Sequence, residues 1–251
     1  MDKETIQKNF SKSAAHYDNY ANIQKLVASE LLTKLDGTGY SNILEIGCGT
    51  GIYTSLLQNR FPQAQIRAID FSPEMTNIAK AKLDNIKFIT TDGELAILDE
   101  SFDLISSNAC FQWFEDLKAA LARYKFMLEK DGALLFSIFG PLTYFELHAS
   151  LQELSKKKLP LAASAFIDKD ELIELLGETF SDFTIEEKII TEKHPTLKSL
   201  LSKIKYTGTR GNGIEGQPLG PMALRKLEKI YKSNFKKITA SHHIFYCKAK
   251  K

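Results

Sequence analysis

The sequence predicts an α/β fold built on a doubly wound, mostly parallel sheet, and three patterns support this. Short apolar runs alternate with segments of helical period from residue 42 to residue 140. Three glycines follow the first apolar run, at the point where a strand would turn into a helix. A Ser-Pro pair, Ser72 and Pro73, stands where the second helix should begin. Because alternating strands and helices produce parallel pairing, we expect one layered sheet.

Seven segments are predicted as strands, since each is an apolar or alternating run bounded by turn residues. They cover residues 41–47, 65–70, 86–90, 102–108, 132–140, 183–194 and 242–250. Between these strands, apolar residues recur with the period of an α-helix. This spacing predicts helices over 52–61, 72–83, 117–130, 141–158 and 168–180, with two more inside 195–235. Residues 7–35 predict two further helices, with a polar, aromatic joint over 17–21.

The chain length suits one domain, residues 1–251, with a helical elaboration. Residues 1–35 are expected to form a helical lid, and residues 42–140 a cofactor-binding core. Residues 141–183 and 195–237 are interpreted as helical insertions that form a cap, and residues 238–251 as the last strand. No linker rich in Pro, Ser or Gly separates two independent units.

Composition excludes several classes of function. With a net charge of +2, the overall electrostatic potential of the chain is too weak to indicate binding to nucleic acid. The charged N-terminus has no export signal, and no apolar run reaches the roughly 20 residues that span a bilayer, so we expect a cytoplasmic protein without membrane contact. The three cysteines, Cys48, Cys110 and Cys247, are scattered, which predicts reduced thiols. The histidines lack metal-ligand spacing and are expected to be structural, apart from His16, so no metal is predicted.

The stretch "LEIGCGTG" indicates a ligand site. Gly47, Gly49 and Gly51 let the backbone approach a ligand closely, and the next helix offers free N–H groups. The dinucleotide fingerprint G-x-G-x-x-G would need a glycine at Ile52, so the pattern disfavours NAD and FAD.

Three acids suggest what the ligand carries. Glu45 precedes Gly47 by two residues, and its charge would repel a pyrophosphate but attract an ammonium or sulfonium cation. Asp70 ends the second predicted strand, 19 residues after Gly51, where acids of nucleotide folds bind a ribose diol. Asp92, in "TTDGE", follows the third strand within reach of an adenine amino group.

The segments "LEIGCGTG", "AIDFSPEM", "TTDGE" and "GALLFSIFG", taken in order, resemble the class I S-adenosylmethionine-dependent methyltransferases over residues 42–140. The resemblance implies a Rossmann-like, seven-stranded sheet with an antiparallel last strand and a helical lid. It also implies S-adenosylmethionine as cofactor. The cofactor-binding residues it suggests are Gln24, Glu45, Gly47, Cys48, Gly49, Gly51, Asp70, Phe71, Met75, Asp92, Gly93 and Asn108.

Four further segments, "FSKSAAHYDNYANIQ", "NACFQWFEDL", "FSIFGPLTYFEL" and "IKYTGTRGNG", resemble the malonyl-acyl-carrier-protein O-methyltransferases of biotin synthesis. This resemblance implies methyl transfer to the free carboxylate of a malonyl thioester, on acyl carrier protein or coenzyme A. The resulting ester would prime pimeloyl synthesis for biotin. Arg210 and the extra glycines of the last segment depart from the family pattern.

Four residues are candidates for contacting the acceptor: Tyr17, His16, Arg210 and Lys205. Tyr17 could donate a hydrogen bond to the carboxylate or simply pack beneath the lid. Arg210 and Lys205 could meet the carboxylate or a carrier phosphate, or belong to a solvated basic loop. A carboxylate is already ionised at neutral pH, so no strong general base is needed.

Two other kinds of function remain possible from the sequence: a different methyltransferase, or a protein that binds the cofactor without catalysis. The chain could methylate a small carboxylic acid resembling trans-aconitate, or a phenol or quinone, or it could bind S-adenosylmethionine without turnover.

The lysines that could present a basic face to an acidic carrier, or merely aid solubility, are Lys156–Lys158, Lys226, Lys229, Lys232, Lys236 and Lys237. Residues 1–28 are expected to close over the cofactor as a lid, hinged at the joint over 17–21.

Overall fold

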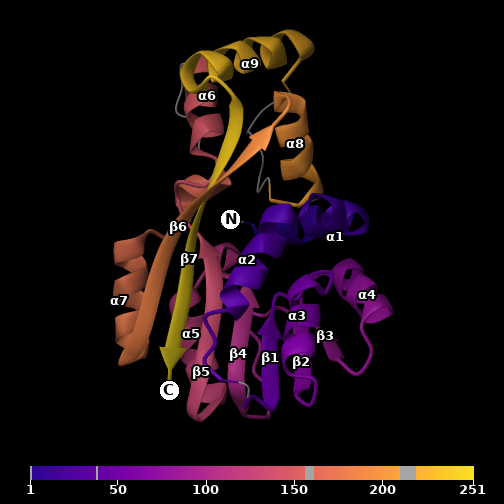
Figure 1. The fold of residues 1–251 in the computed structure, drawn as a ribbon, viewed down its shortest axis with the longest axis vertical. Coiled ribbons are helices and arrows are strands. Elements are labelled where there is room, and N and C mark those ends of the chain that lie inside the picture. The colour runs from indigo at the N-terminus through magenta and orange to yellow at the C-terminus, as the bar shows by residue number, and fades with distance from the viewer. Residues whose placement is uncertain (1, 38, 156–160, 210–218) are drawn as a thin grey trace.

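The computed structural model describes residues 2–37, 39–155, 161–209 and 219–251. They form a seven-stranded sheet in the order β3-β2-β1-β4-β5-β7-β6 (Figure 1). The strands are β1 (Asn42–Ile46), β2 (Gln65–Asp70), β3 (Lys87–Thr90), β4 (Phe102–Asn108), β5 (Leu128–Phe139), β6 (Asp182–His194) and β7 (Ile238–Lys250).

The first five strands are parallel, and β7 lies antiparallel between β5 and β6. The predicted fold class is therefore confirmed, including the antiparallel last strand. Strand order runs one way from β1 to β3 and the other way from β1 through β4 to β5. This reversal places the carboxyl ends of β1 and β4 side by side, the position at which open α/β sheets bind ligands.

Helices cover both faces of the sheet. The α-helices are α1 (Lys3–Tyr20), α2 (Asn22–Leu32), α3 (Ile52–Arg60), α4 (Pro73–Lys82), α5 (Leu117–Met127), α6 (Phe145–Ser155), α7 (Lys169–Thr179), α8 (Leu197–Tyr206) and α9 (Pro221–Phe235). Two 3-10 turns, η1 (Phe111–Trp113) and η2 (Ala162–Ala165), complete the described elements. Helices α5 and α7 bury their apolar sides on one face of the sheet, and α2 and α3 on the other.

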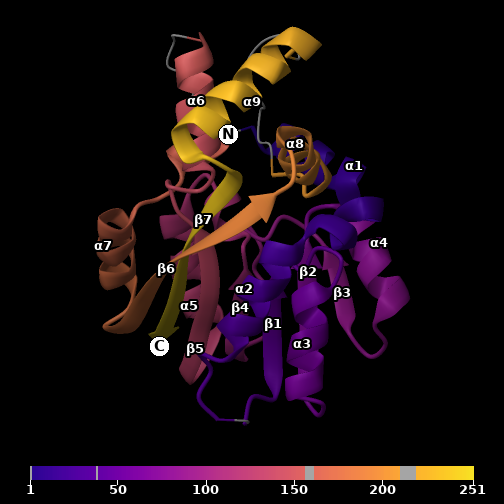
Figure 2. The same ribbon diagram turned by 45° about the horizontal axis from the view of Figure 1, so that its top comes forward.

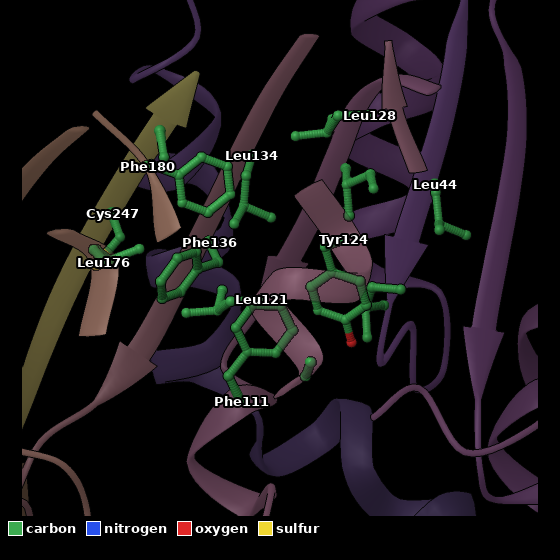
Figure 3. Packing of buried hydrophobic residues seen from close by; sticks show 14 of the residues in the cluster. Leu44, Phe111, Leu121, Tyr124, Leu128, Leu134, Phe136, Leu176, Phe180 and Cys247 are labelled. Carbon is green, nitrogen blue, oxygen red and sulfur yellow. The ribbon is translucent and has the colours of Figure 1, made fainter. Parts of the chain in front are cut away.

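The larger core cluster lies between the sheet and the pair α5 and α7 (Figure 3). Tyr124 of α5 stacks on Phe111 with ring centroids 5.5 Å apart, and Phe111 also contacts Phe136 of β5. The Tyr124 hydroxyl donates a 2.8 Å hydrogen bond to the Gly93 carbonyl, in the loop after β3. The core therefore fixes a loop that carries predicted ligand contacts.

Side-chain caps fix the starts of two helices, at the predicted Ser72 and at Asp168. Ser72 accepts a hydrogen bond from the Met75 backbone N–H at the start of α4, and Pro73 occupies the first turn. Asp168 caps α7 and forms a capping box with Glu171.

Three boundaries differ from the sequence prediction. The helix expected over 117–130 ends at Met127, because Leu128 already pairs with Phe102 in the sheet. The last strand begins at Ile238, the residue at which the domain division started it, and so extends four residues before the alternating run 242–250, because its first residues pair with β6. The break in the N-terminal helices is confined to Ala21, and α1 continues through the predicted joint to Tyr20.

A separate helical layer stands beyond the carboxyl edge of the sheet (Figures 1 and 2). Helices α6, α8 and α9 share a third apolar cluster with the first residues of β7, and we call these three helices the cap. The buried Glu146 carboxylate of α6 accepts hydrogen bonds from the Ser241 backbone and hydroxyl, at 2.9 and 2.7 Å. Helix α7, which the sequence analysis grouped with the cap, packs instead against α5.

None of the described helices is long and apolar enough to cross a membrane. Within the same residues, no group of three or more His, Cys, Asp or Glu side chains is placed to hold a metal ion.

Candidate active site

A pocket opens at the carboxyl ends of β1, β2 and β4, where the strand order reverses, and we call it the donor pocket. It is bounded by the turns that follow these strands and, on the remaining side, by α1. The residues that line it are Lys3, Phe10, Tyr17, Gly47, Gly49, Asp70, Phe71, Met75, Asp92, Gly93, Asn108, Ala109, Cys110, Trp113 and Phe114. Nine of the predicted site residues are thus brought together there.

Asp70 ties two turns together at the floor of the donor pocket. Its Oδ2 accepts a 2.9 Å hydrogen bond from the Gly49 N–H, and its Oδ1 accepts a 2.8 Å bond from the Ser72 N–H. Burial raises the pKa of Asp70 to about 6, and backbone hydrogen bonds partly oppose that rise. The carboxylate is therefore mostly ionised at neutral pH and is held in the pocket by both turns.

The three glycines of the turn have different roles. Gly47 has φ +73°, and a Cβ there would lie 2.3 Å from the Cys110 Sγ, so no larger residue fits. Gly49 has φ +54°, but an added Cβ would meet nothing within 4 Å. Gly49 therefore borders open space in the donor pocket. Gly51 lies outside the lining and packs on α4, where a Cβ would come within 3.2 Å of the Ala79 Cβ.

Glu45 is more deeply buried than its sequence position suggested. It is 1% exposed, lies outside the lining, and its Oε2 has no hydrogen-bond partner among the described residues. Burial raises the pKa of Glu45 to about 8. The side chain is mostly neutral at pH 7, so Asp70 rather than Glu45 supplies a carboxylate charge at this edge.

Helix α1 forms the wall of the donor pocket that faces the cap. Lys3 pairs with Asp92 at 2.6 Å and with Glu94 at 2.7 Å. The Gln7 side-chain amide donates to the Phe71 carbonyl at 2.6 Å. These contacts join the start of α1 to the turns after β2 and β3.

Aromatic rings close the pocket beneath α1. The ring centroid of Phe10 lies 5.8 Å from that of Trp113, with the rings edge-on. It lies 6.5 Å from the ring centroids of both Tyr17 and Phe71. Burial, followed by the nearby Asp70 carboxylate, raises the pKa of Tyr17. Its hydroxyl therefore remains protonated and can donate a hydrogen bond.

Some predicted cofactor contacts support the pocket from behind. Asn108 lines the pocket and donates from Nδ2 to the Gln24 carbonyl at 3.2 Å, whereas Gln24 itself lies outside the lining. Cys48 is also outside, and burial raises the pKa of its thiol well above the usual value. The thiol is therefore neutral and chemically inert, and the predicted contact of Cys48 with the cofactor stays a prediction.

Two of the acceptor candidates lie apart from the donor pocket, at the contact between α1 and α8. The His16 ring is exposed and meets Tyr206 edge-on at 5.2 Å. Lys205 is exposed, with its Nζ 5.2 Å from the centre of the same Tyr206 ring. Arg210 lies outside the described residues. Of the four candidates, the structure places Tyr17 in the pocket.

Sequence reasoning missed several lining residues. Ala109 and Cys110 directly follow β4, as Gly47 follows β1, so their position at a strand's carboxyl end was an available signal. Ala109 also has φ +54°, a strained conformation for alanine that is frequent at functional sites. Lys3 carried no signal, since nothing in the sequence indicates that the start of α1 reaches Asp92. The remaining missed residues are Phe10 and Phe114, whereas the sequence left open whether Trp113 lines the site or packs below it.

Comparison with known proteins identifies the family. A family model described as a methyltransferase domain matches residues 44–136. A malonyl-acyl-carrier-protein O-methyltransferase of Bacillus anthracis is 35% identical, with 98% of this chain and 96% of the relative covered. An enzyme of the same name from Acetivibrio thermocellus is 34% identical over 100% of this chain and 95% of its own. The chain belongs to the malonyl-acyl-carrier-protein O-methyltransferase family.

Solved structures support the same fold. The YcgJ protein of Bacillus subtilis aligns with a TM-score of 0.63 at 13% identity, over 90% of this chain and 98% of that one. A Haemonchus contortus N-methyltransferase in complex with S-adenosylhomocysteine aligns with a TM-score of 0.54 at 19% identity, over 91% of this chain and 52% of that one. With the family established, the chain is an S-adenosylmethionine-dependent O-methyltransferase, as the sequence predicted.

Replacing Asp70 by Ala should weaken the binding of S-adenosylhomocysteine by about 5-fold to 150-fold, because charge-assisted hydrogen bonds contribute roughly 1 to 3 kcal/mol. Gly49→Val should weaken binding more, since its side chain would project into the pocket from a left-handed backbone position. Calorimetry measures both affinities, with Asp99→Ala on the exposed surface as control. Wild-type affinity in both variants would contradict this placement of the cofactor.

Proposed function

We propose that this enzyme transfers the methyl group of S-adenosylmethionine to the free carboxylate of a malonyl group held as a thioester on acyl carrier protein. The observation that carries the proposal is the extent of the similarity. It covers 98% of the chain in the Bacillus anthracis relative, whereas the general methyltransferase match covers residues 44–136. The similarity therefore extends over α1 and the cap, which lie outside that match, and we expect these elements to border the side from which an acceptor enters.

The donor pocket suits S-adenosylmethionine. We expect Asp70 to accept hydrogen bonds from the ribose diol, and Asp92 to accept one from the adenine amino group; both carboxylates line the pocket. Gly49 leaves room for a ligand beside the backbone. When bound, the cofactor supplies an electrophilic methyl group on a cationic sulfur, and aromatic side chains such as Phe10 and Trp113 suit a neighbouring cation.

The reaction needs orientation more than proton transfer. A carboxylate oxygen forms a bond to the methyl carbon as the carbon–sulfur bond breaks, so the sulfonium and the carboxylate both lose their charge. No proton is transferred, and none of the described pocket-lining residues is a histidine. Holding the two reactants in line can contribute about 7 kcal/mol or more. The aromatic wall beneath α1 excludes water from this alignment.

Charge indicates the side from which the carrier approaches. Helix α9 exposes Arg225, Lys226, Lys229 and Lys232, and Lys236 and Lys237 follow it directly. Its single carboxylate, Glu228, pairs with Lys232 at 2.6 Å. A groove beside α5 and α7, on another side of the molecule, is instead lined by four glutamates: Glu115, Glu171, Glu174 and Glu178. An acidic carrier should therefore dock on α9. Lys156–Lys158, also predicted to contribute, lie outside the described residues.

The function is tested by incubating the pure protein with S-adenosylmethionine and malonyl-acyl carrier protein. Mass spectrometry should show a carrier-bound methyl ester with one methyl group per malonyl. Acetyl-acyl carrier protein, which has no free carboxylate, serves as control. Transfer instead to a small tricarboxylic acid or a phenol, or no turnover with any acceptor, would contradict the proposal.

Tyr17→Phe should lower kcat by about tenfold while leaving the affinity for S-adenosylhomocysteine unchanged. The substitution keeps the ring beside Phe10 and removes only the hydroxyl that would orient the acceptor carboxylate. Steady-state kinetics and calorimetry measure the two quantities. Unchanged turnover would show that Tyr17 only packs beneath α1.

Reversing two charges on α9, Lys226→Glu with Lys229→Glu, should raise the KM for malonyl-acyl carrier protein about tenfold at low salt. The KM for malonyl-coenzyme A should stay constant, because that substrate has no acidic protein surface. Lys130→Glu, an exposed charge change near the start of β5 at the opposite end of the sheet, is the matched control. An equal change in the KM of both substrates would argue against docking of the carrier on α9.

A further inference from the structure

A buried cluster of charged and ring side chains lies beneath α8, outside the donor pocket. Glu192 of β6 forms an ion pair with Lys203 of α8. The rings of His194 and His242 approach the same carboxylate, with their Nε2 atoms 3.2 and 3.8 Å from Glu192 Oε2. Lys203 is 5% exposed and His242 is 2% exposed. Three nitrogen groups therefore converge on one carboxylate oxygen.

The antiparallel pairing of β6 with β7 creates this convergence. His242 is directly opposite Ile190, so it shares a face of the ribbon with Glu192 and His194, which follow Ile190 at alternate positions. Helix α8 covers that face and inserts Lys203. The cluster is thus specified by strand register and helix packing.

The cluster has spare hydrogen-bonding capacity. A lysine ammonium carries three N–H groups, and among the described residues Lys203 donates to Glu192 alone. The His242 Nε2 has no hydrogen-bond partner in the described ranges, because 3.8 Å from Glu192 is too long. Buried polar groups are almost always paired, so this combination suits a second carboxylate supplied by a ligand.

Tyr144 extends the cluster and is held in a strained conformation. Its φ is +61°, which a bulky side chain rarely adopts, and its backbone N–H is fixed to the Ser241 carbonyl at 2.7 Å. The buried ring meets His242 edge-on at 5.1 Å, and the hydroxyl bonds to the side chain of Thr209. Strain of this kind is concentrated at functional sites.

The cluster continues to the donor pocket through α1. Tyr144 makes a small electrostatic contribution to the raised pKa of Tyr17, after burial and the Asp70 carboxylate. Gly208, next to Thr209, packs on Phe10, where an added Cβ would come within 2.8 Å of the ring. Phe10 lines the donor pocket, so the residues that directly follow α8 pack against the same helix that borders this pocket.

We propose that Tyr144, His242 and Lys203 form the subsite that recognises the free carboxylate of the acceptor. This inference rests on the proposed function and assigns its specificity to named side chains. The ammonium is already shared with Glu192, so it attracts a second carboxylate without clamping it as firmly as a free bidentate arginine would. Methyl transfer removes the acceptor's charge, so the same subsite favours the acid over its ester and over acyl groups without a free carboxylate.

Two variants separate recognition from a structural role of the ion pair. Lys203→Met removes the ammonium and leaves Glu192 unpaired, whereas Lys203→Met with Glu192→Gln removes both charges and keeps the packing volume. Both variants should raise the KM for malonyl-acyl carrier protein about tenfold or more, since a charge-assisted hydrogen bond is lost. The inhibition constant of the methyl ester product and the affinity for S-adenosylhomocysteine should stay at wild-type values, and Lys203→Arg should recover part of the KM.

The possible outcomes distinguish recognition of the acceptor carboxylate by Lys203 from a purely structural role of the Lys203–Glu192 ion pair. A wild-type KM in the folded double variant would show that Lys203 only balances Glu192, and would overturn the subsite. An equal loss of affinity for substrate and for ester product would also overturn it, because the ester carries no charge to recognise. Failure of the wild-type enzyme to methylate malonyl-acyl carrier protein would remove the proposed function and this inference together.

Discussion

The hydrogen bonds from two backbone N–H groups to the Asp70 carboxylate are the constraint on which the site depends. One donor, Gly49, belongs to the turn after β1, and the other, Ser72, caps α4 after β2. The same side chain therefore fixes the glycine turn, starts a helix and presents a charge to the pocket. Burial raises the pKa of this group to about 6, and the two N–H donors help it remain ionised at neutral pH.

Around that floor, the remaining walls come from distant parts of the chain. Lys3 and Phe10 of α1 reach the turns after β2 and β3, and Gly208 packs on Phe10 from the other side. The helix that borders the donor pocket is consequently the helix against which the cap rests. The donor pocket and the proposed acceptor subsite therefore border the same helix, α1.

The sheet, its order of elements and most of the pocket floor could be predicted from the sequence, because they depend on local patterns. Apolar runs followed by glycine or an acid identify strand ends, and strand ends of a parallel sheet meet at one edge. The charge of Glu45 could not be predicted, since its neutralisation depends on burial among side chains that are distant in sequence. Lys3 could not be predicted for the same reason. The cluster around Glu192 depends on the register of β6 and β7, which the sequence pattern left unspecified.

The most direct test of this account is a crystal structure of the enzyme with S-adenosylhomocysteine bound. The account predicts that the ribose hydroxyls lie within hydrogen-bond distance of the Asp70 carboxylate, with Phe10 and Tyr17 in contact with the ligand. A ligand bound elsewhere, or one whose ribose lies away from Asp70 with α1 out of contact, would contradict it.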